Sequence, residues 1–347
     1  MAGPERSLSV VHVVVTNGFA GVERYVCQVA GELARRGHRL HIIGGDPVRM
    51  RSELPDTVPH RPASHLLSAA AALATAGDAD LLHVHMTAAE GAAWLARPFQ
   101  RAPLVATRHF AAGRGSSPVA RGLARVTSRA IRRDIAISRF VARTIASPSV
   151  VIPNGVPERP QAALVSPTVV MLQRLDTEKA PDVGVRAFAL SGLAQQGWRL
   201  VVAGQGALGP SLVRLVEELG LAGSAELVGH MARTDQLLAE SSVLLAPAPL
   251  EPFGLSVVEA MAYGLPVVAA GGGAHLETVG EDGLLFPPGD APAAATALAR
   301  LGQDVGLRCS VGTALRQRHH DRFTLSRHVD RLEHLYREVV DGVRQPV

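Results

Sequence analysis

The stretch that decides the fold is residues 243–270, which read VLLAPAPLEPFGLSVVEAMAYGLPVVAA. An apolar run at Val243–Ala246 predicts a buried strand, and a loop bracketed by prolines follows it. We expect a short helix to begin at Gly254 and to end at Gly264, because glycine readily takes the backbone conformation that ends a helix. A second apolar strand, Val267–Ala270, comes directly afterwards. Strand, helix and strand in this order predict one unit of a parallel α/β sheet.

Two glutamates flank the start of this helix, Glu251 in the loop and Glu259 in the helix itself. The first N–H groups of a helix lack partners and carry partial positive charge, so the turn suits a phosphate group. Carboxylates repel phosphate, and we therefore expect the two glutamates to accept hydrogen bonds from sugar or ribose hydroxyls. The combination indicates a nucleotide-sugar site. The backbone amides of this site would come from Phe253, Gly254, Leu255 and Ser256.

This run resembles the donor-site signature of the retaining glycosyltransferases of family four, which have the two-domain GT-B fold. The resemblance covers nearly the whole chain, because further segments match in order and spacing. It implies an α/β fold of two Rossmann-like, doubly wound parallel-sheet domains facing a central cleft, with a C-terminal helix that crosses back to the first domain. The matching segments are VVMLQRLDTEKAPDVGVRAF (169–188), LVVAGQGAL (200–208), AELVGHMARTDQLLAESSVLLAPA (225–248) and GGGAHLETVGEDGLLFPPGD (271–290).

The resemblance also assigns roles to single residues. Among the 35 lysines and arginines, Lys179 is the one lysine, and it follows a predicted strand in Arg174-Leu-Asp-Thr-Glu-Lys179. The matching arginine and lysine of the family neutralise the donor diphosphate, and a compact ammonium on a flexible stem suits phosphate oxygens. The glutamate matching Glu251 lies beside the donor sugar there, and the one matching Glu259 binds ribose. Gly229, in the third matching segment, is a further expected donor-site residue.

The length and composition fit two packed domains. A chain of 347 residues with 47% hydrophobic residues is too long for one ordinary core and too apolar for disorder. With the resemblance, this predicts an acceptor-binding domain at 1–157, a donor-binding domain at 158–322 and a returning helical segment at 323–347. Within the first domain we expect a loop over 46–66 and a basic helix over 118–133.

The candidate site residues of the first domain lie at the ends of its predicted strands. His109 matches a family position at which a histidine reaches the donor sugar or the acceptor; a histidine hydrogen-bonded within its own loop is the competing interpretation. We expect Arg108 and His85 to line the acceptor pocket. Gly18 and Gly21 follow the first strand and would approach the donor phosphates, although the family usually has two adjacent glycines there. The predicted catalytic set is Glu251, His109, Arg174 and Lys179.

We expect no metal and no cofactor. His83 and His85 alternate with apolar residues and so point to one side of their strand, but the sequence offers no further recognisable ligands beside them. A diphosphate held by Arg174, Lys179 and helix amides needs no metal, and the nucleoside diphosphate sugar is a co-substrate.

The predicted reaction is the metal-independent transfer of a hexose from a UDP- or GDP-linked donor to an acceptor hydroxyl, with retention and therefore an α-glycosidic bond. Two alternatives stay open: a nucleotide-sugar epimerase or hydrolase of the same fold, and a non-catalytic nucleotide-sugar-binding protein. The acceptor, whether a small molecule, a lipid-linked molecule or a saccharide, and the nucleotide base cannot be deduced from the sequence.

Charge, cysteines and hydropathy suggest the cellular setting. Two cysteines in different predicted domains favour a reducing compartment, and no apolar run reaches the roughly 20 residues that span a bilayer. We therefore expect a cytoplasmic protein. Arg121, Arg125 and Arg129 recur every four residues, which fits either peripheral contact with an anionic membrane or a solvated face. A net charge of +4 gives no indication of nucleic-acid binding.

Overall fold

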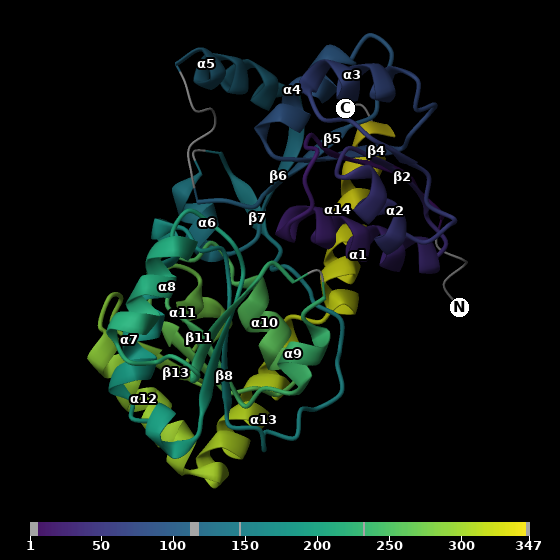
Figure 1. Ribbon diagram of the computed structural model, residues 1–347. Helices are drawn as coiled ribbons and strands as arrows, with labels where there is room; N and C mark the ends of the chain where they lie inside the picture. The colour runs from purple at the N-terminus through teal and green to yellow at the C-terminus, as the bar shows by residue number, and fades with distance from the viewer. Residues whose placement is uncertain (1–5, 112–117, 146, 232, 345–347) are drawn as a thin grey trace, which may run out of the picture. The chain divides into compact units, whose positions relative to one another are not determined.

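The computed structural model contains two compact units, each with its own parallel sheet (Figure 1). Unit 1 comprises Met1–Gly155 and Leu325–Val347, and unit 2 comprises Val156–Thr324. The prediction of two Rossmann-like parallel-sheet domains is confirmed. The predicted boundaries, after residues 157 and 322, differ from the observed ones, after 155 and 324, by two residues. The structure describes residues 6–111, 118–145, 147–231 and 233–344.

Unit 1 is a doubly wound sheet of seven parallel strands in the order β3-β2-β1-β4-β5-β6-β7. Helices α1, α2 and α14 lie on one face, and α3, α4 and α5 lie on the other (Figure 1). The strands are β1 (Ser9–Val14), β2 (Arg39–Ile43), β3 (His60–Arg61), β4 (Leu81–His85), β5 (Leu104–Arg108), β6 (Ile131–Ala136) and β7 (Ser149–Val151). The helices are α1 (Gly21–Arg35), α2 (Pro47–Glu53), α3 (Leu66–Ala74), α4 (Thr87–Leu95), α5 (Pro118–Thr127), α6 (Arg139–Thr144) and α14 (Leu325–Arg344).

Two local predictions for unit 1 were wrong. The expected loop over 46–66 contains helix α2, because the Asp46 carboxylate accepts hydrogen bonds from the amides of Val48 and Arg49 and so caps a helix that begins at a proline. The expected basic helix over 118–133 ends at Thr127. Arg132 and Arg133 lie instead on β6, where they are exposed.

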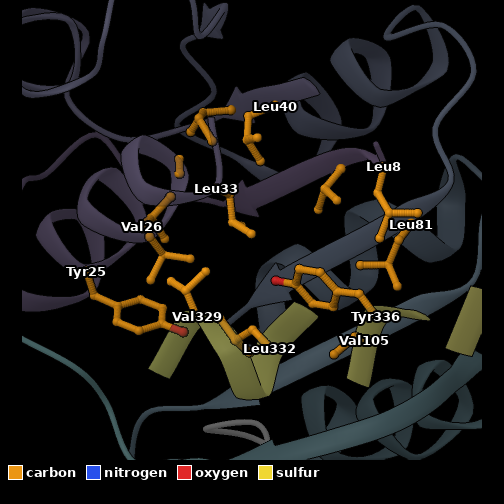
Figure 2. Packing of buried hydrophobic residues seen from close by; sticks show 14 of the residues in the cluster. Leu8, Tyr25, Val26, Leu33, Leu40, Leu81, Val105, Val329, Leu332 and Tyr336 are labelled. Carbon is orange, nitrogen blue, oxygen red and sulfur yellow. The ribbon is translucent and has the colours of Figure 1, made fainter. Parts of the chain in front are cut away.

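The C-terminal helix α14 belongs to unit 1, as the predicted fold requires. Its Val329, Leu332 and Tyr336 are fully buried or nearly so against apolar side chains of α1 and of the sheet, among them Val26 and Leu33 (Figure 2). Apolar burial of this kind is the main force that holds a helix to a sheet. The helix is therefore an integral part of the core of unit 1.

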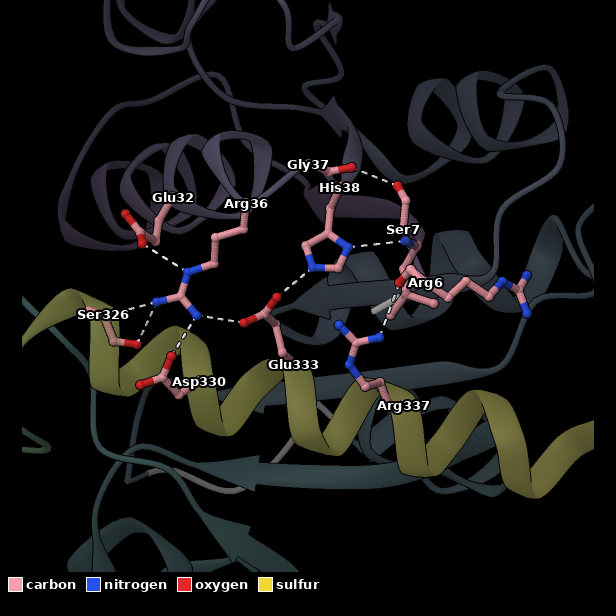
Figure 3. A network of polar contacts seen from close by, with 11 residues as sticks. Arg6, Ser7, Glu32, Arg36, Gly37, His38, Ser326, Asp330, Glu333 and Arg337 are labelled. Carbon is pink, nitrogen blue, oxygen red and sulfur yellow. Dashed lines mark hydrogen bonds and ion pairs between the residues drawn. The ribbon is translucent and has the colours of Figure 1, made fainter. Parts of the chain in front are cut away.

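A polar network along a neighbouring stripe of α14 also ties this helix to the end of α1 and the start of β2 (Figure 3). Arg36, directly after α1, donates to Glu333 and Asp330 at 2.5 and 2.6 Å. His38 accepts from the amide of Leu8 through Nδ1 at 3.0 Å, so its Nε2–H donates to Glu333 at 2.5 Å. Glu333 is thus the residue of α14 at which two cationic or donor groups of unit 1 converge.

Unit 2 is a doubly wound sheet of six parallel strands in the order β10-β9-β8-β11-β12-β13. Helices α7, α8 and α12 lie on one face, and α10 and α13 lie on the other (Figure 1). The strands are β8 (Thr168–Leu172), β9 (Arg199–Ala203), β10 (Ala225–Gly229), β11 (Val243–Ala246), β12 (Val267–Ala270) and β13 (Leu284–Phe286). The helices are α7 (Pro181–Leu190), α8 (Gly209–Glu218), α9 (Asp235–Ala239), α10 (Leu255–Ala262), α11 (His275–Thr278), α12 (Ala291–Gln303) and α13 (Val305–Arg322).

Each sheet reverses its strand order at one point, which lies between β1 and β4 in unit 1 and between β8 and β11 in unit 2. Ligands of open α/β sheets bind beyond the carboxyl ends of the strands at such a point. The loops that leave these strands are therefore the first place to look for a site.

Candidate functional site

The loops after β8 and β11 bring together two of the charged residues predicted for the donor site. The ammonium of Lys179 lies 2.6 Å from a carboxylate oxygen of Glu251, although the two residues are 72 positions apart in the chain. Their side chains are 16% and 15% exposed, so the ion pair is partly shielded from water. It lies at the strand-order reversal of unit 2.

The backbone around Lys179 is held in a defined turn. The side-chain amide of Gln173 donates to the carbonyl of Lys179 at 3.0 Å. Ala180 adopts a left-handed conformation with φ 44°, and Pro181 then begins α7. A non-glycine residue in this conformation is uncommon and persists where the surrounding structure requires it.

The three-glycine loop after β12 positions the backbone of Glu251. Gly273 forms a bridge with Glu251, and the amide of Ala274 donates to the Glu251 carbonyl at 2.7 Å. A Cβ added to Gly273 would lie 2.5 Å from that carbonyl, and one added to Gly272 would lie 1.9 Å from the carbonyl of Pro249. This run therefore packs against the backbone that carries the glutamate.

The start of α10 leaves backbone amides available to a ligand. Gly254 caps the helix with φ 86° and has no side chain that could accept from the first amides. A Cβ at this position would lie 3.3 Å from the ring of His275, which is buried and bonded through Nδ1 to the carbonyl of Ala270. Burial lowers the pKa of His275, and the Glu251 carboxylate opposes that shift. The turn is therefore closely packed against His275 and the Glu251 side chain.

Of the other residues predicted for this turn, Phe253 is buried and Leu255 and Ser256 are partly buried. The ring of Phe253 is buried and lies edge-to-face against Phe323, with centroids 5.9 Å apart. Leu255 and Ser256 are partly buried at the first positions of α10. The buried ring of Phe253 cannot contact a ligand, so this residue could contribute its backbone amide but not its side chain.

The structure does not test the expected roles of Arg174, Glu259 and Gly229. The guanidinium of Arg174 is 58% exposed and is paired with Asp176 and Glu178 of its own loop. Glu259 is partly buried in α10. Gly229 ends β10 with φ 71°, and its carbonyl accepts from the amide of Gly204. The roles of these three residues stay predictions.

In unit 1 the structure brings His85 and His109 together. His85 ends β4 and His109 directly follows β5, and Nδ1 of the first lies 3.0 Å from Nε2 of the second. His85 is fully buried and His109 is 7% exposed. Both rings therefore lie at the carboxyl edge of the sheet, and the role of His109 towards a sugar or acceptor stays a prediction.

The structure places Arg108 in a buried ion-pair network, and its expected role at the acceptor stays a prediction. Its guanidinium is buried and binds two carboxylates of unit 1, Glu90 and Asp134, the second at 2.7 Å. Arg108 ends β5, and this pairing links that strand to α4 and β6. The pairing partners are too distant in the sequence to be found by motif.

His12, which was not predicted as a site residue, forms a buried cluster with His83 and His85 on the α1 and α14 side of the sheet. His12 lies on β1 directly opposite His83 of β4, and its Nδ1 is 3.0 Å from Nε2 of His85. The ligand atoms of His12, His83 and His85 all lie within 4.8 Å of one another, a spacing that could accommodate a metal ion. The register between β1 and β4, which the sequence does not contain, creates this grouping.

Gly18 and Gly21 lie at the strand-order reversal of unit 1, after β1, as the sequence predicted. The Glu23 carboxylate accepts from the amide of Ala20 at 2.8 Å, directly before α1 begins at Gly21. An anionic side chain thus already occupies part of this helix start. A phosphate contact by these glycines stays a prediction.

Comparison with known families agrees with the geometry of both units. Residues 19–159 match the family described as Glycosyltransferase Family 4, and residues 158–318 match the one described as Glycosyl transferases group 1. Phosphatidyl-myo-inositol mannosyltransferase of Mycobacterium leprae is 30% identical over 83% of this chain and 85% of that relative. An exopolysaccharide phosphotransferase of Streptomyces coelicolor is 37% identical over 56% of this chain, but the chain spans 21% of its length.

A solved structure shows the same fold. HepE of Anabaena, crystallised in complex with UDP-glucose, superposes with a TM-score of 0.79 at 19% identity, over 95% of this chain and all of that one. In the described part of the chain, no helix is both long enough and apolar enough to cross a bilayer.

Proposed function

Because this chain belongs to the family-four glycosyltransferases, we propose that it transfers a hexose from a nucleoside diphosphate sugar to an acceptor hydroxyl, with retention at the anomeric carbon and without a metal. The bond between the anomeric carbon and the diphosphate breaks, and the diphosphate leaves with the electron pair. The acceptor oxygen bonds to the same carbon and loses its proton. The product carries an α-linkage.

The observation that carries this proposal is the Lys179–Glu251 pair at the strand-order reversal of unit 2. The departing diphosphate gains negative charge, which the Lys179 ammonium and the amides at the start of α10 would stabilise. Glu251 would then accept from a hydroxyl of the sugar. Arg174 supports the same step, because its exposed ion pairs contribute less than about 1 kcal/mol and can be exchanged for phosphate contacts.

A structural neighbour supports the class of donor that we propose. The Anabaena structure is described with UDP-glucose, and a UDP- or GDP-linked hexose is the donor we propose for this chain. His109 is the residue of unit 1 that we assign to the donor sugar or the acceptor. The acceptor is a small molecule, a saccharide or a lipid-linked molecule; in the last case the exposed Arg121 and Arg125 of α5 would favour contact with an anionic membrane surface.

A thermal-shift panel of UDP, GDP, ADP and their hexose conjugates tests the proposal. A ligand at a hundredfold excess over its dissociation constant adds about 2.7 kcal/mol of apparent stability. We expect one diphosphate and its sugar to raise the melting temperature. Quantitative release of free sugar or epimer, without transfer to any acceptor added, would favour a hydrolase or epimerase instead.

A further inference from the structure

Three buried histidines of unit 1 form one continuous chain of hydrogen bonds. His12 Nδ1 lies 3.0 Å from His85 Nε2, and His85 Nδ1 lies 3.0 Å from His109 Nε2. The rings of His12 and His85 are stacked, with an interplanar angle of 9°. Because each hydrogen bond joins two ring nitrogens, the nitrogen that carries the proton in one ring determines which nitrogen carries it in the next ring.

All three rings are neutral. Burial lowers the pKa of His12 and of His109 to about 3, with His328 and Arg108 adding to the shift of His109. Burial and the neighbouring histidines lower the pKa of His85 well below its ordinary value. A neutral imidazole carries one proton on one of its two nitrogens, and each hydrogen bond in the chain needs exactly one. The protons therefore all point from His12 towards His109, or all point the other way.

The buried end of the chain decides between these two arrangements. His12 Nε2 is buried and has no hydrogen-bond partner among the described residues. If the protons pointed inwards, this nitrogen would carry an N–H group without an acceptor, which is rarer in folded proteins than an acceptor without a donor. If they point outwards, His12 Nε2 is a bare acceptor and His109 carries its proton on Nδ1.

We propose that His12 and His85 are positioning residues that hold His109 as the Nδ1–H tautomer, so that His109 offers a hydrogen-bond donor to a sugar hydroxyl or phosphate oxygen. This inference rests on the proposed function only in assigning His109 to the substrate. His83 lies outside the chain, because its two nitrogens are each 2.6 Å from other partners, the hydroxyls of Tyr336 and Thr107.

The same cluster could instead hold a divalent cation, since His12, His83 and His85 lie close enough. A cation would need one bare nitrogen from each ring. Because both nitrogens of His85 take part in the chain, such a cation would break its hydrogen bond to His12 or to His109. Metal binding and the tautomer chain are thus mutually exclusive, and one experiment separates them.

The test is a long-range proton–nitrogen NMR correlation on the full-length protein with 15N-labelled histidine, which shows which ring nitrogen carries the proton. His109→Asn assigns the His109 signals. We expect the proton on Nδ1 of His109 in the native protein. In His12→Leu we expect a mixture of both tautomers and a turnover about tenfold lower, and in His12→Asn, whose amide can donate to His85, the native tautomer.

Thr107→Val is the matched control, because it removes a partner of His83 and leaves the chain from His12 to His109 intact; it should keep the native tautomer. A proton on Nε2 of His109 in the native protein, an unchanged tautomer in His12→Leu, or stoichiometric zinc binding that His12→Leu abolishes would each overturn the proposal. The native spectrum decides the direction of the chain even if His12→Leu does not fold. The spectrum is recorded without substrate, so a result against the proposed tautomer would not by itself contradict the glycosyltransferase proposal.

Discussion

The Lys179 ammonium donates to the Glu251 carboxylate across 2.6 Å, so the two groups neutralise each other in the structure. One residue follows β8 and the other follows β11, and the two strands are neighbours in the sheet of unit 2. If the donor diphosphate binds Lys179 as we propose, it would compete with Glu251 for the lysine. Donor binding would then be coupled to a rearrangement of this pair.

Neutralising Glu251 should separate binding from turnover. In Glu251→Gln the lysine loses its anionic partner, so UDP or GDP should bind several-fold more tightly, whichever of them the protein uses. Sugar transfer should fall by about a hundredfold, because Glu251 is the residue that we propose to contact the donor sugar. Calorimetry and donor consumption measure the two effects. Weaker nucleotide binding in this variant would show that Glu251 does not compete with phosphate.

Gly273→Ala should disturb Glu251 through the backbone. The new Cβ would lie 2.5 Å from the Glu251 carbonyl, at a φ of 58°. Gly289→Ala is the matched control, since its φ is 83° and no atom lies within 4 Å of the added Cβ. We expect both variants to lose about 1 kcal/mol through backbone strain, and Gly273→Ala to lose about 1–3 kcal/mol more together with nucleotide binding. Equal denaturation midpoints and equal nucleotide affinities would contradict this account.

Much of the fold was predictable from local signals. The strands at Val243–Ala246 and Val267–Ala270 were predicted to the residue, because each is an apolar run bounded by polar or turn-forming residues. Helix α2 was missed, because the arginines and prolines around it obscure a helix that depends on one aspartate cap. The short edge strand β13 was missed as well, since three residues carry too weak a pattern.

The candidate site was predictable only where a motif contains it. Lys179 and Glu251 each stand in a recognisable segment, and the sheet order brings them into contact. His12 could not be found, because a single histidine in an apolar strand gains its meaning from the register with β4. The ion pair between Arg108 and Glu90 could not be predicted either, because it depends on how α4 packs against β5.

Removing Glu333 should loosen α14 from unit 1. Glu333→Ala leaves the nearly buried Nε2–H of His38 without its acceptor and removes one of the carboxylates around Arg36. We expect a loss of about 2–3 kcal/mol in the free energy of unfolding, measured by chemical denaturation. Glu338→Ala, whose carboxylate is 54% exposed on the same helix, should change it by less than about 0.5 kcal/mol. Similar effects of the two substitutions would mean that the network of Figure 3 does not anchor the helix.

Mild acid should destabilise the protein through its buried histidines. Burial lowers the pKa of His12 and His109 to about 3 and that of His328 to about 4, whereas unfolded histidines titrate near 6.5. Between pH 6.5 and 4 the unfolded state therefore binds more protons, and the free energy of unfolding falls as the pH falls. Protonation of each such histidine in the unfolded state should lower the free energy of unfolding by about 2 kcal/mol between neutral pH and pH 5.

Melting temperatures at pH 7.5 and 5 test this dependence. His334→Gln, which alters an exposed histidine of α14, should show the same drop as the native protein. A melting temperature that does not change between the two pH values would rule out the buried neutral cluster.

The central claim is that the Lys179–Glu251 site of unit 2 binds the diphosphate of the donor, and calorimetric titration of the full chain with UDP and with GDP tests it most directly. We expect one of them to bind, and Lys179→Ala to weaken binding at least tenfold, about 1.4 kcal/mol. Arg199→Ala removes an exposed positive charge of the same unit that pairs with Glu226, and it should leave the affinity unchanged. Binding of neither nucleotide, or equal affinities of Lys179→Ala and the native protein, would contradict the account.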